Sequence, residues 1–170
     1  MSLTATKPSA ERRIIELGLS LPRIPVPVAN FVPFRRNGDT VFLAGQICEW
    51  NGTVAYHGKI GVDHDLATGV KAARICALNL LAVLREACGG SLDRVVACMR
   101  VGGFVNCSPD YENVPQVING ASDLFCNLFG ERGSHSRTAV GVATLPRRAA
   151  VEVDAIFVVD CDNTSRGRAR

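Results

Sequence analysis

Three stretches of the chain repeat apolar residues at steps of three and four, the spacing that gathers them on one face of a helix. They cover residues 9–19, 65–88 and 111–129. Ser9 and Asp65 stand at the start of the first two stretches as N-cap candidates, and glycines follow both of the longer ones. The pattern therefore predicts one short and two long helices.

Shorter runs alternate apolar and polar residues with a period of two, which is typical of strands with one buried face. They predict six strands, at residues 31–35, 40–44, 53–57, 92–104, 136–144 and 151–156. The last two runs are apolar on one face only, so both long helices are expected to cover that face. The predicted fold class is α+β, with a six-stranded mixed sheet and two helices packed on one face.

The last two runs flank a Leu-Pro-Arg-Arg turn and predict an antiparallel hairpin. One face of this hairpin suits a core and carries Thr138, Val140, Val142, Val151, Val153 and Ala155. The other face carries Arg137, Ala139, Gly141, Ala143, Glu152 and Asp154. Charged groups among small residues on a sheet indicate a shallow cavity that holds a guanidinium and a carboxylate.

Those two groups suggest a chemistry. A guanidinium is the preferred bidentate partner of a carboxylate ligand, and a free carboxylate can orient or deprotonate water. In the hairpin register, Arg137 and Glu152 lie about four residues apart, roughly 13 Å. They are not expected to pair within one chain, which fits a pocket shared across an interface. His135 is interpreted as a loop histidine, because no oriented acid partner accompanies it.

Composition excludes several classes of protein. The chain has 170 residues, of which 47% are hydrophobic, so one compact domain is expected rather than disorder. A net charge of +3 without a dense basic block does not imply nucleic-acid binding. By the sequence pattern, no stretch approaches the roughly 18 apolar residues of a membrane span, so a soluble cytoplasmic protein is expected. The seven cysteines show no metal-ligand spacing, and neither a metal nor a cofactor is expected.

The chain divides into three parts by composition. Residues 1–27 hold the short helix and a proline-rich arm, residues 28–160 form the main domain, and residues 161–170 are expected to be a flexible tail.

Three features together resemble the RidA/YjgF family, also called the endoribonuclease L-PSP family, over about residues 28–159. They are V-F-L-A-G-Q at residues 41–46, the long helix followed by a valine-rich strand, and R-x-x-x-x-V-x-x-L-P with the later V-E-V-D-A-I. The resemblance implies a chorismate-mutase-like protomer assembled as a homotrimer, with small-molecule pockets between subunits. Characterised relatives hydrolyse reactive enamines and imines, such as 2-iminobutanoate, to a 2-keto acid and ammonia.

By position, the resemblance assigns four pocket residues. Arg137 matches the family arginine that grips the substrate carboxylate, and Glu152 matches the glutamate that positions the hydrolytic water. Gly45 matches a glycine at the pocket wall, and Asn119 falls near a helix position found at the pocket in relatives.

Three further pocket positions depart from the family pattern. Phe31, Ala44 and Ala139 stand where many deaminase members have tyrosine, serine and cysteine, respectively. Each change removes a polar side chain, so the chain is interpreted as a member of a divergent subgroup.

The sequence therefore predicts a RidA-like imine deaminase that acts on a small carboxylate-bearing metabolite. In this hypothesis Arg137 holds the substrate and Glu152 orients water. The alternative is a binding or regulatory homologue without turnover, which the three lost polar side chains favour. RNA cleavage is a third hypothesis, carried only by the family's older name.

Overall fold

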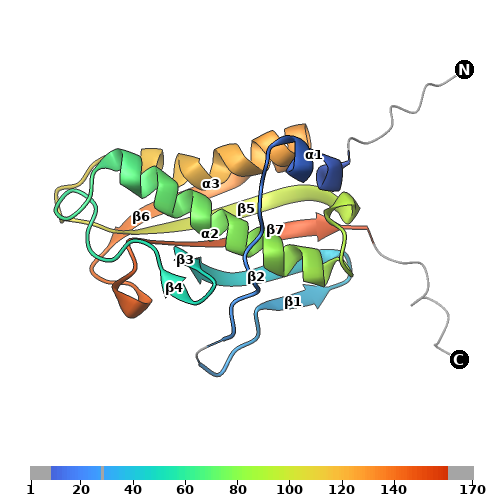
Figure 1. Cartoon of the computed structure of the whole chain (residues 1–170), viewed down its shortest axis with the longest axis horizontal. Coiled ribbons are helices and arrows are strands. Elements are labelled where there is room, and N and C mark those ends of the chain that lie inside the picture. Colours follow the sequence, from blue (N-terminus) through green and yellow to red (C-terminus); the bar gives the residue numbers. More distant parts are fainter. Residues whose placement is uncertain (1–8, 28, 161–170) are drawn as a thin grey trace, which may run out of the picture.

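A five-stranded mixed sheet forms one layer of the protein and two long helices form the other (Figure 1). The computed structural model describes residues 9–27 and 29–160. In spatial order the sheet consists of β1 (Phe34–Asn37), β2 (Thr40–Ile47), β7 (Val151–Val159), β5 (Val95–Asn106) and β6 (Ser136–Val142). A separate ribbon pairs β3 (Glu49–Trp50) with β4 (Thr53–Val54). The helices are α1 (Ala10–Glu16), α2 (Leu66–Ala87) and α3 (Val114–Phe129), and short 3-10 turns are η1 (Leu92–Arg94), η2 (Gly130–Gly133) and η3 (Pro146–Arg148).

The three predicted helices are confirmed, and their ends follow from local chemistry. The Ser9 and Asp65 side chains accept hydrogen bonds from backbone N–H groups of the first turns of α1 and α2. The α2 helix stops before Gly89, and α3 stops before Gly130, both of which have positive φ. The Glu11 side chain then fixes α1 to the main domain, because it accepts a hydrogen bond of 2.8 Å from the backbone of Leu92.

Both long helices cover the same face of the sheet, as the sequence predicts (Figure 1). Their contact is close, because a Cβ added at Gly120 of α3 would overlap the backbone carbonyl of Val70 on α2. The sheet also approaches α3 closely, since a Cβ at Gly103 of β5 would meet the side chain of Ile118. Glycine at these positions brings the helices and the sheet within reach of one another.

The predicted hairpin between β6 and β7 is wrong. β6 pairs in parallel with β5, while β7 lies between β2 and β5 and is antiparallel to both. The parallel pair is possible because α3 supplies the long crossover that two parallel strands require. Alternation along a run indicates a strand, but it does not identify the strand's partner.

The predicted faces hold for β7 but not for β6. Val151, Val153 and Ala155 are buried toward the helices, as expected. Arg137 pairs across the sheet with Val101, which pairs in turn with Ala155, so Arg137 also points to the helix side.

The alternate residues of β6 accordingly lie on the open face. Val140 is in register with Phe104 and Glu152, and it is 40% exposed rather than in the core. Thr138 is in register with Gly102 and Asp154 on that same face, so the expected core positions Thr138 and Val140 are reversed.

The main sheet has five strands rather than six. Of residues 53–57, only Thr53–Val54 forms a strand, and this strand belongs to the small ribbon. Phe31 lies ahead of β1, which begins at Phe34 instead of residue 31. Both differences arise near proline or a tight turn, where a pattern of two or three residues does not define where a strand begins or ends.

Among the helices of the described residues, α2 is long and apolar enough to cross a membrane by length and composition, with a mean hydropathy of 1.5. The expectation that no segment approaches this length does not hold for α2. Most of that segment is buried in the fold, as in any core helix, so it is weak support for a span.

The α2–α3 contact yields a stability test. Gly120→Ala should lower the free energy of unfolding by about 1–3 kcal/mol, because the new methyl group displaces the α2 backbone. In thermal unfolding this corresponds to a Tm lower by several degrees. Asn127→Ala, at an exposed position of the same helix, is the control and should leave Tm unchanged. Equal Tm values for the two variants would contradict the close contact.

Candidate functional site

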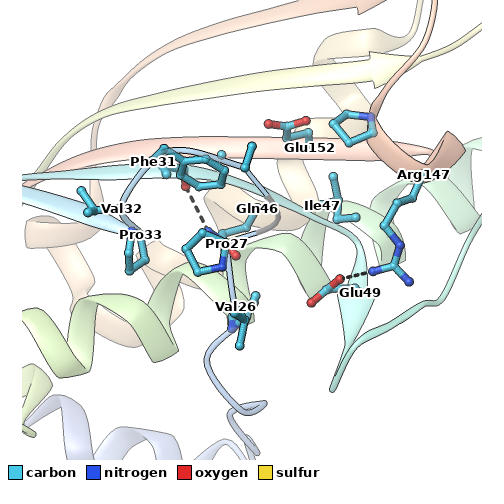
Figure 2. Close-up of a pocket in the computed structure, with 15 residues that line it drawn as sticks. Val26, Pro27, Phe31, Val32, Pro33, Gln46, Ile47, Glu49, Arg147 and Glu152 are labelled. Carbon is cyan, nitrogen blue, oxygen red and sulfur yellow. Dashed lines mark hydrogen bonds and ion pairs between the residues drawn. The ribbon is translucent and has the colours of Figure 1, made fainter.

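A cavity of about 500 Å³ opens beside β7 on the side away from the helices (Figure 2). The proline arm, β2 and β3, η3 and β7 all contribute to it. Its lining residues are Pro25, Val26, Pro27, Ala29, Phe31, Val32, Pro33, Ala44, Gly45, Gln46, Ile47, Glu49, Pro146, Arg147 and Glu152. Four residues that the resemblance assigns to a pocket, Phe31, Ala44, Gly45 and Glu152, thus share one cavity.

Glu152 reaches this cavity because β2 is irregular opposite it. Leu43 pairs with Ala155 but Gln46 pairs with Val153, so Ala44 and Gly45 form a bulge. A Cβ at Gly45 would overlap the carboxyl group of Glu152. Glycine at position 45 therefore leaves the space that the glutamate side chain occupies.

The Glu152 carboxyl group has a raised pKa and no partner among the described residues. Burial raises its pKa above the ordinary value for glutamate, and the negative charge of Asp154 raises the pKa further. Asp154 is itself paired with Arg100 at 3.0 Å. Within residues 9–27 and 29–160, Glu152 has neither a hydrogen-bond donor nor an ion-pair partner. Such a carboxyl group holds a proton more readily than an ordinary glutamate does, and it is free to bind water.

Arg147 is the basic residue in the wall of the cavity, and the sequence interpretation assigned it only to a turn. Its guanidinium donates to Glu49 at 2.7 Å and to the backbone carbonyl of Gly52 at 2.9 Å. Arg147 and Arg148 both have positive φ, 54° and 57°, which is uncommon for residues with side chains. This turn directs Arg147 toward the buried Glu49 carboxylate (Figure 2).

Arg137 lies on the opposite face of the sheet from Glu152. It donates to Asn119 Oδ1 at 2.8 Å, to Ser122 Oγ at 3.0 Å and to the backbone carbonyl of Pro115 at 3.2 Å, all on α3. A guanidinium has five N–H donors, so these three bonds leave two. Ala139 follows on the same side of β6. The cavity of one chain thus lacks Arg137, Asn119 and Ala139.

His135 has a partner that sequence reasoning missed. Its Nδ1 lies 2.6 Å from the carbonyl of Gly133, which can only accept, so Nδ1 carries the proton in the neutral ring. Its Nε2 then accepts from Ser122 Oγ at 2.9 Å. This leaves a lone pair of Ser122 toward Arg137. His135 therefore belongs to the group of residues that orients Arg137, although thirteen residues separate it from Ser122.

Comparison with known proteins identifies the family. The profile described as "YjgF/chorismate mutase-like, putative endoribonuclease" matches residues 11–157. The chain belongs to this family. Its members are oligomers that bind small molecules. The resemblance and the fold class inferred from the sequence are both confirmed.

Three relatives illustrate the range of similarity within the YjgF family. Protein TCP17 of Trypanosoma cruzi is 40% identical over 141 residues, which cover 82% of this chain and 88% of that protein. A 2-iminobutanoate/2-iminopropanoate deaminase of Dermatophagoides farinae is 28% identical over 144 residues, covering 84% and 95%. The crystal structure of a protein of unknown function from Agrobacterium tumefaciens is 40% identical, has a TM-score of 0.83, and covers 89% of this chain and 92% of that one.

The raised pKa of Glu152 yields a test of the site. A carboxyl group with a raised pKa in the folded state favours folding when protonated, and this contribution is lost as pH rises through that pKa. Glu152→Gln should therefore raise Tm by a few degrees at pH 8, and the gain should vanish below about pH 4, where the unfolded chain is protonated as well. Thermal unfolding between pH 4 and 8 measures this. Glu112→Gln, at an exposed position, is the control. A lower Tm for Glu152→Gln at pH 8 would contradict the assignment.

Proposed function

We propose that the protein hydrolyses 2-imino acids to 2-keto acids and ammonia in sites formed between protomers of a homotrimer. Arg137 of one protomer holds the substrate carboxylate, and Glu152 of its neighbour orients the attacking water. The observation that carries the proposal is the unpaired Glu152 carboxyl group in a cavity whose other charged groups are already paired. The relative from Dermatophagoides farinae, named for this activity, supports it.

The chemistry requires one water molecule and one group that accepts and returns a proton. Glu152 takes a proton from water as the oxygen bonds to the imine carbon, and it passes that proton to the imine nitrogen, which gives a carbinolamine. Glu152 then takes the proton of the new hydroxyl group and passes it to the amino group as the C=O bond forms and the C–N bond breaks, so that ammonia leaves and the keto acid remains. A carboxyl group whose pKa lies above the ordinary value suits both steps, since it accepts a proton more readily than an ordinary glutamate does.

The positions of the two charged residues support assembly. Arg137 and Glu152 lie on opposite faces of one sheet, so a single protomer cannot bring both to one substrate. β6 is an edge strand, and the Arg137 side chain is exposed beside α3, where another protomer can approach it. The open face also exposes apolar side chains, Phe42 and Val140 among them, as an interface between subunits would require.

The three positions that depart from the family pattern, Phe31, Ala44 and Ala139, leave the groups required by the mechanism in place. None of them removes the carboxyl group of Glu152 or the two unused donors of Arg137. A proximity effect from a carboxylate held by Arg137 contributes several kcal/mol without them. The alternative function, binding without turnover, is distinguished by tight binding of 2-keto acids together with no acceleration of imine hydrolysis.

Arg137→Ala tests the role of the arginine. With 2-iminobutanoate supplied by a threonine dehydratase, this variant should lose about a hundredfold in kcat/KM, since a charged bidentate contact is removed. Arg137→Lys should recover only part of the loss, because it restores charge without the fork geometry. Arg12→Ala, on exposed α1, is the control and should keep full activity. Unchanged hydrolysis by Arg137→Ala would overturn the assignment.

Mixed assemblies test whether sites are shared. Arg137→Ala and Glu152→Gln protomers should each have strongly reduced activity alone but regain activity when co-expressed. In a random mixture, a site is intact when its arginine comes from a Glu152→Gln protomer and its glutamate from an Arg137→Ala protomer, which is about a quarter of the sites. No recovery in mixed assemblies, with trimers present by light scattering, would overturn the shared site.

A further inference from the structure

We propose that the substrates of this protein carry an apolar side chain longer than the ethyl group of 2-iminobutanoate, an inference that rests on the proposed function. The proline arm, defined here as residues 22–27 and 29–33, forms the wall that selects this side chain. The inference follows from how the arm is held, what it exposes, and which polar groups of the cavity are already paired.

The arm is held at both ends against the main domain. The backbone N–H of Arg23 donates to the Asn51 side chain at 2.8 Å, at the turn between β3 and β4. At the other end the carbonyl of Pro33 accepts from the backbone of Ala44 at 2.9 Å. The four prolines of the arm are Pro22, Pro25, Pro27 and Pro33. Their fixed φ reduces the entropy lost when a ligand binds against the wall.

The arm presents apolar side chains at a concave surface. Val26, Phe31 and Val32 are 83%, 47% and 51% exposed, although all three line the cavity. Figure 2 shows them on the arm, with Ile47 and Glu152 on the strands beside the same cavity. Exposed apolar groups gathered at a cavity typically mark a ligand site.

The polar groups of the wall leave little for a polar side chain to bind. The Gln46 amide donates to the carbonyl of Ala44 at 3.3 Å. Arg147 is paired with Glu49 and the Gly52 carbonyl. Among the lining residues that the structure describes, Glu152 alone offers a carboxyl group without a partner. A ligand therefore presents its reacting carbon to Glu152 and an apolar group to the remaining wall.

The size of the cavity indicates how long that apolar group is. Pockets of 300–1,000 Å³ hold whole ligands of drug size, and this cavity has about 500 Å³. An ethyl side chain fills only a small part of this volume, which also receives the substrate carboxylate and the Arg137 side chain of the neighbouring protomer under the proposed function. Each further buried methylene contributes about 0.8 kcal/mol, which is roughly a fourfold gain in kcat/KM.

A substrate series tests the proposal. Imino acids are generated by a flavin L-amino acid oxidase from alanine, 2-aminobutyrate, norvaline and norleucine, with catalase present and ammonia release measured. The values of kcat/KM should rise roughly fourfold with each methylene along this series. A flat series, or one that falls with chain length, would overturn the proposal while leaving imine hydrolysis itself intact.

A variant that fills the cavity makes the test specific to the arm. Ala29→Phe should abolish the gain from chain length, because it should lower kcat/KM for the norleucine-derived imine about tenfold more than for 2-iminopropanoate. Ala67→Phe, the same change at an exposed position of α2 outside the cavity, should behave like the unmodified protein. Retention of the chain-length gain by Ala29→Phe would overturn the role of the arm.

Failure of the proposed function would be recognised separately. If no imine is hydrolysed faster than in buffer, the deaminase proposal is wrong. Calorimetry then still measures the affinity of the cavity for 2-oxobutanoate and for 2-oxohexanoate. Tighter binding of the longer acid, lost in Ala29→Phe, supports an apolar side-chain site. Equal binding of the two acids overturns it.

Discussion

The central position of β7 is the constraint on which the rest of the structure depends. Its alternation sends Val151, Val153 and Ala155 under the helices and Glu152 to the opposite face. A slip of one residue would bury the Glu152 carboxylate in the apolar layer below α2, and a buried unpaired charge costs several kcal/mol. Neighbouring β2 completes the arrangement, since its bulge at Gly45 opens the space that the carboxylate fills. The packing of the core and the site therefore depend on one register.

Local patterns predicted the helices and β7 well, because their signals lie within the elements themselves. The caps at Ser9 and Asp65 and the glycines after α2 and α3 act over one turn. The position of β6 depends on α3 returning the chain to the edge of β5, a long-range constraint that alternation does not carry. On an edge strand, hydrophobicity also fails to indicate the buried face. Val140 is exposed on the open face, while Arg137 lies beside the polar side chains of α3.

The residues of the candidate site also differ in whether a local sequence signal could identify them. Phe31, Ala44, Gly45 and Glu152 came from the resemblance, and they line one cavity because three separate segments meet at β7. Arg147 was missed, since a basic residue in a proline turn looks like ordinary surface in a sequence. Its role depends on positive φ and on the buried Glu49, neither of which a linear pattern reveals. Likewise, the prolines at positions 22, 25 and 27 favoured an extended connection, but they did not indicate that this segment would form a wall of the cavity.

The separation of Arg137 from Glu152 has a physical consequence under the proposed function. Within one protomer an adjacent guanidinium would pair with the glutamate and lower its pKa. That pairing would weaken the glutamate as a proton acceptor and occupy the cation needed by the substrate. On opposite faces, Arg137 is oriented by Asn119 and Ser122 and keeps two donors, while Glu152 keeps a raised pKa. Under the proposed function, assembly of the protomers brings Arg137 and Glu152 to one site, and the substrate carboxylate then neutralises the guanidinium. Assembly thus completes the site without first cancelling its charges.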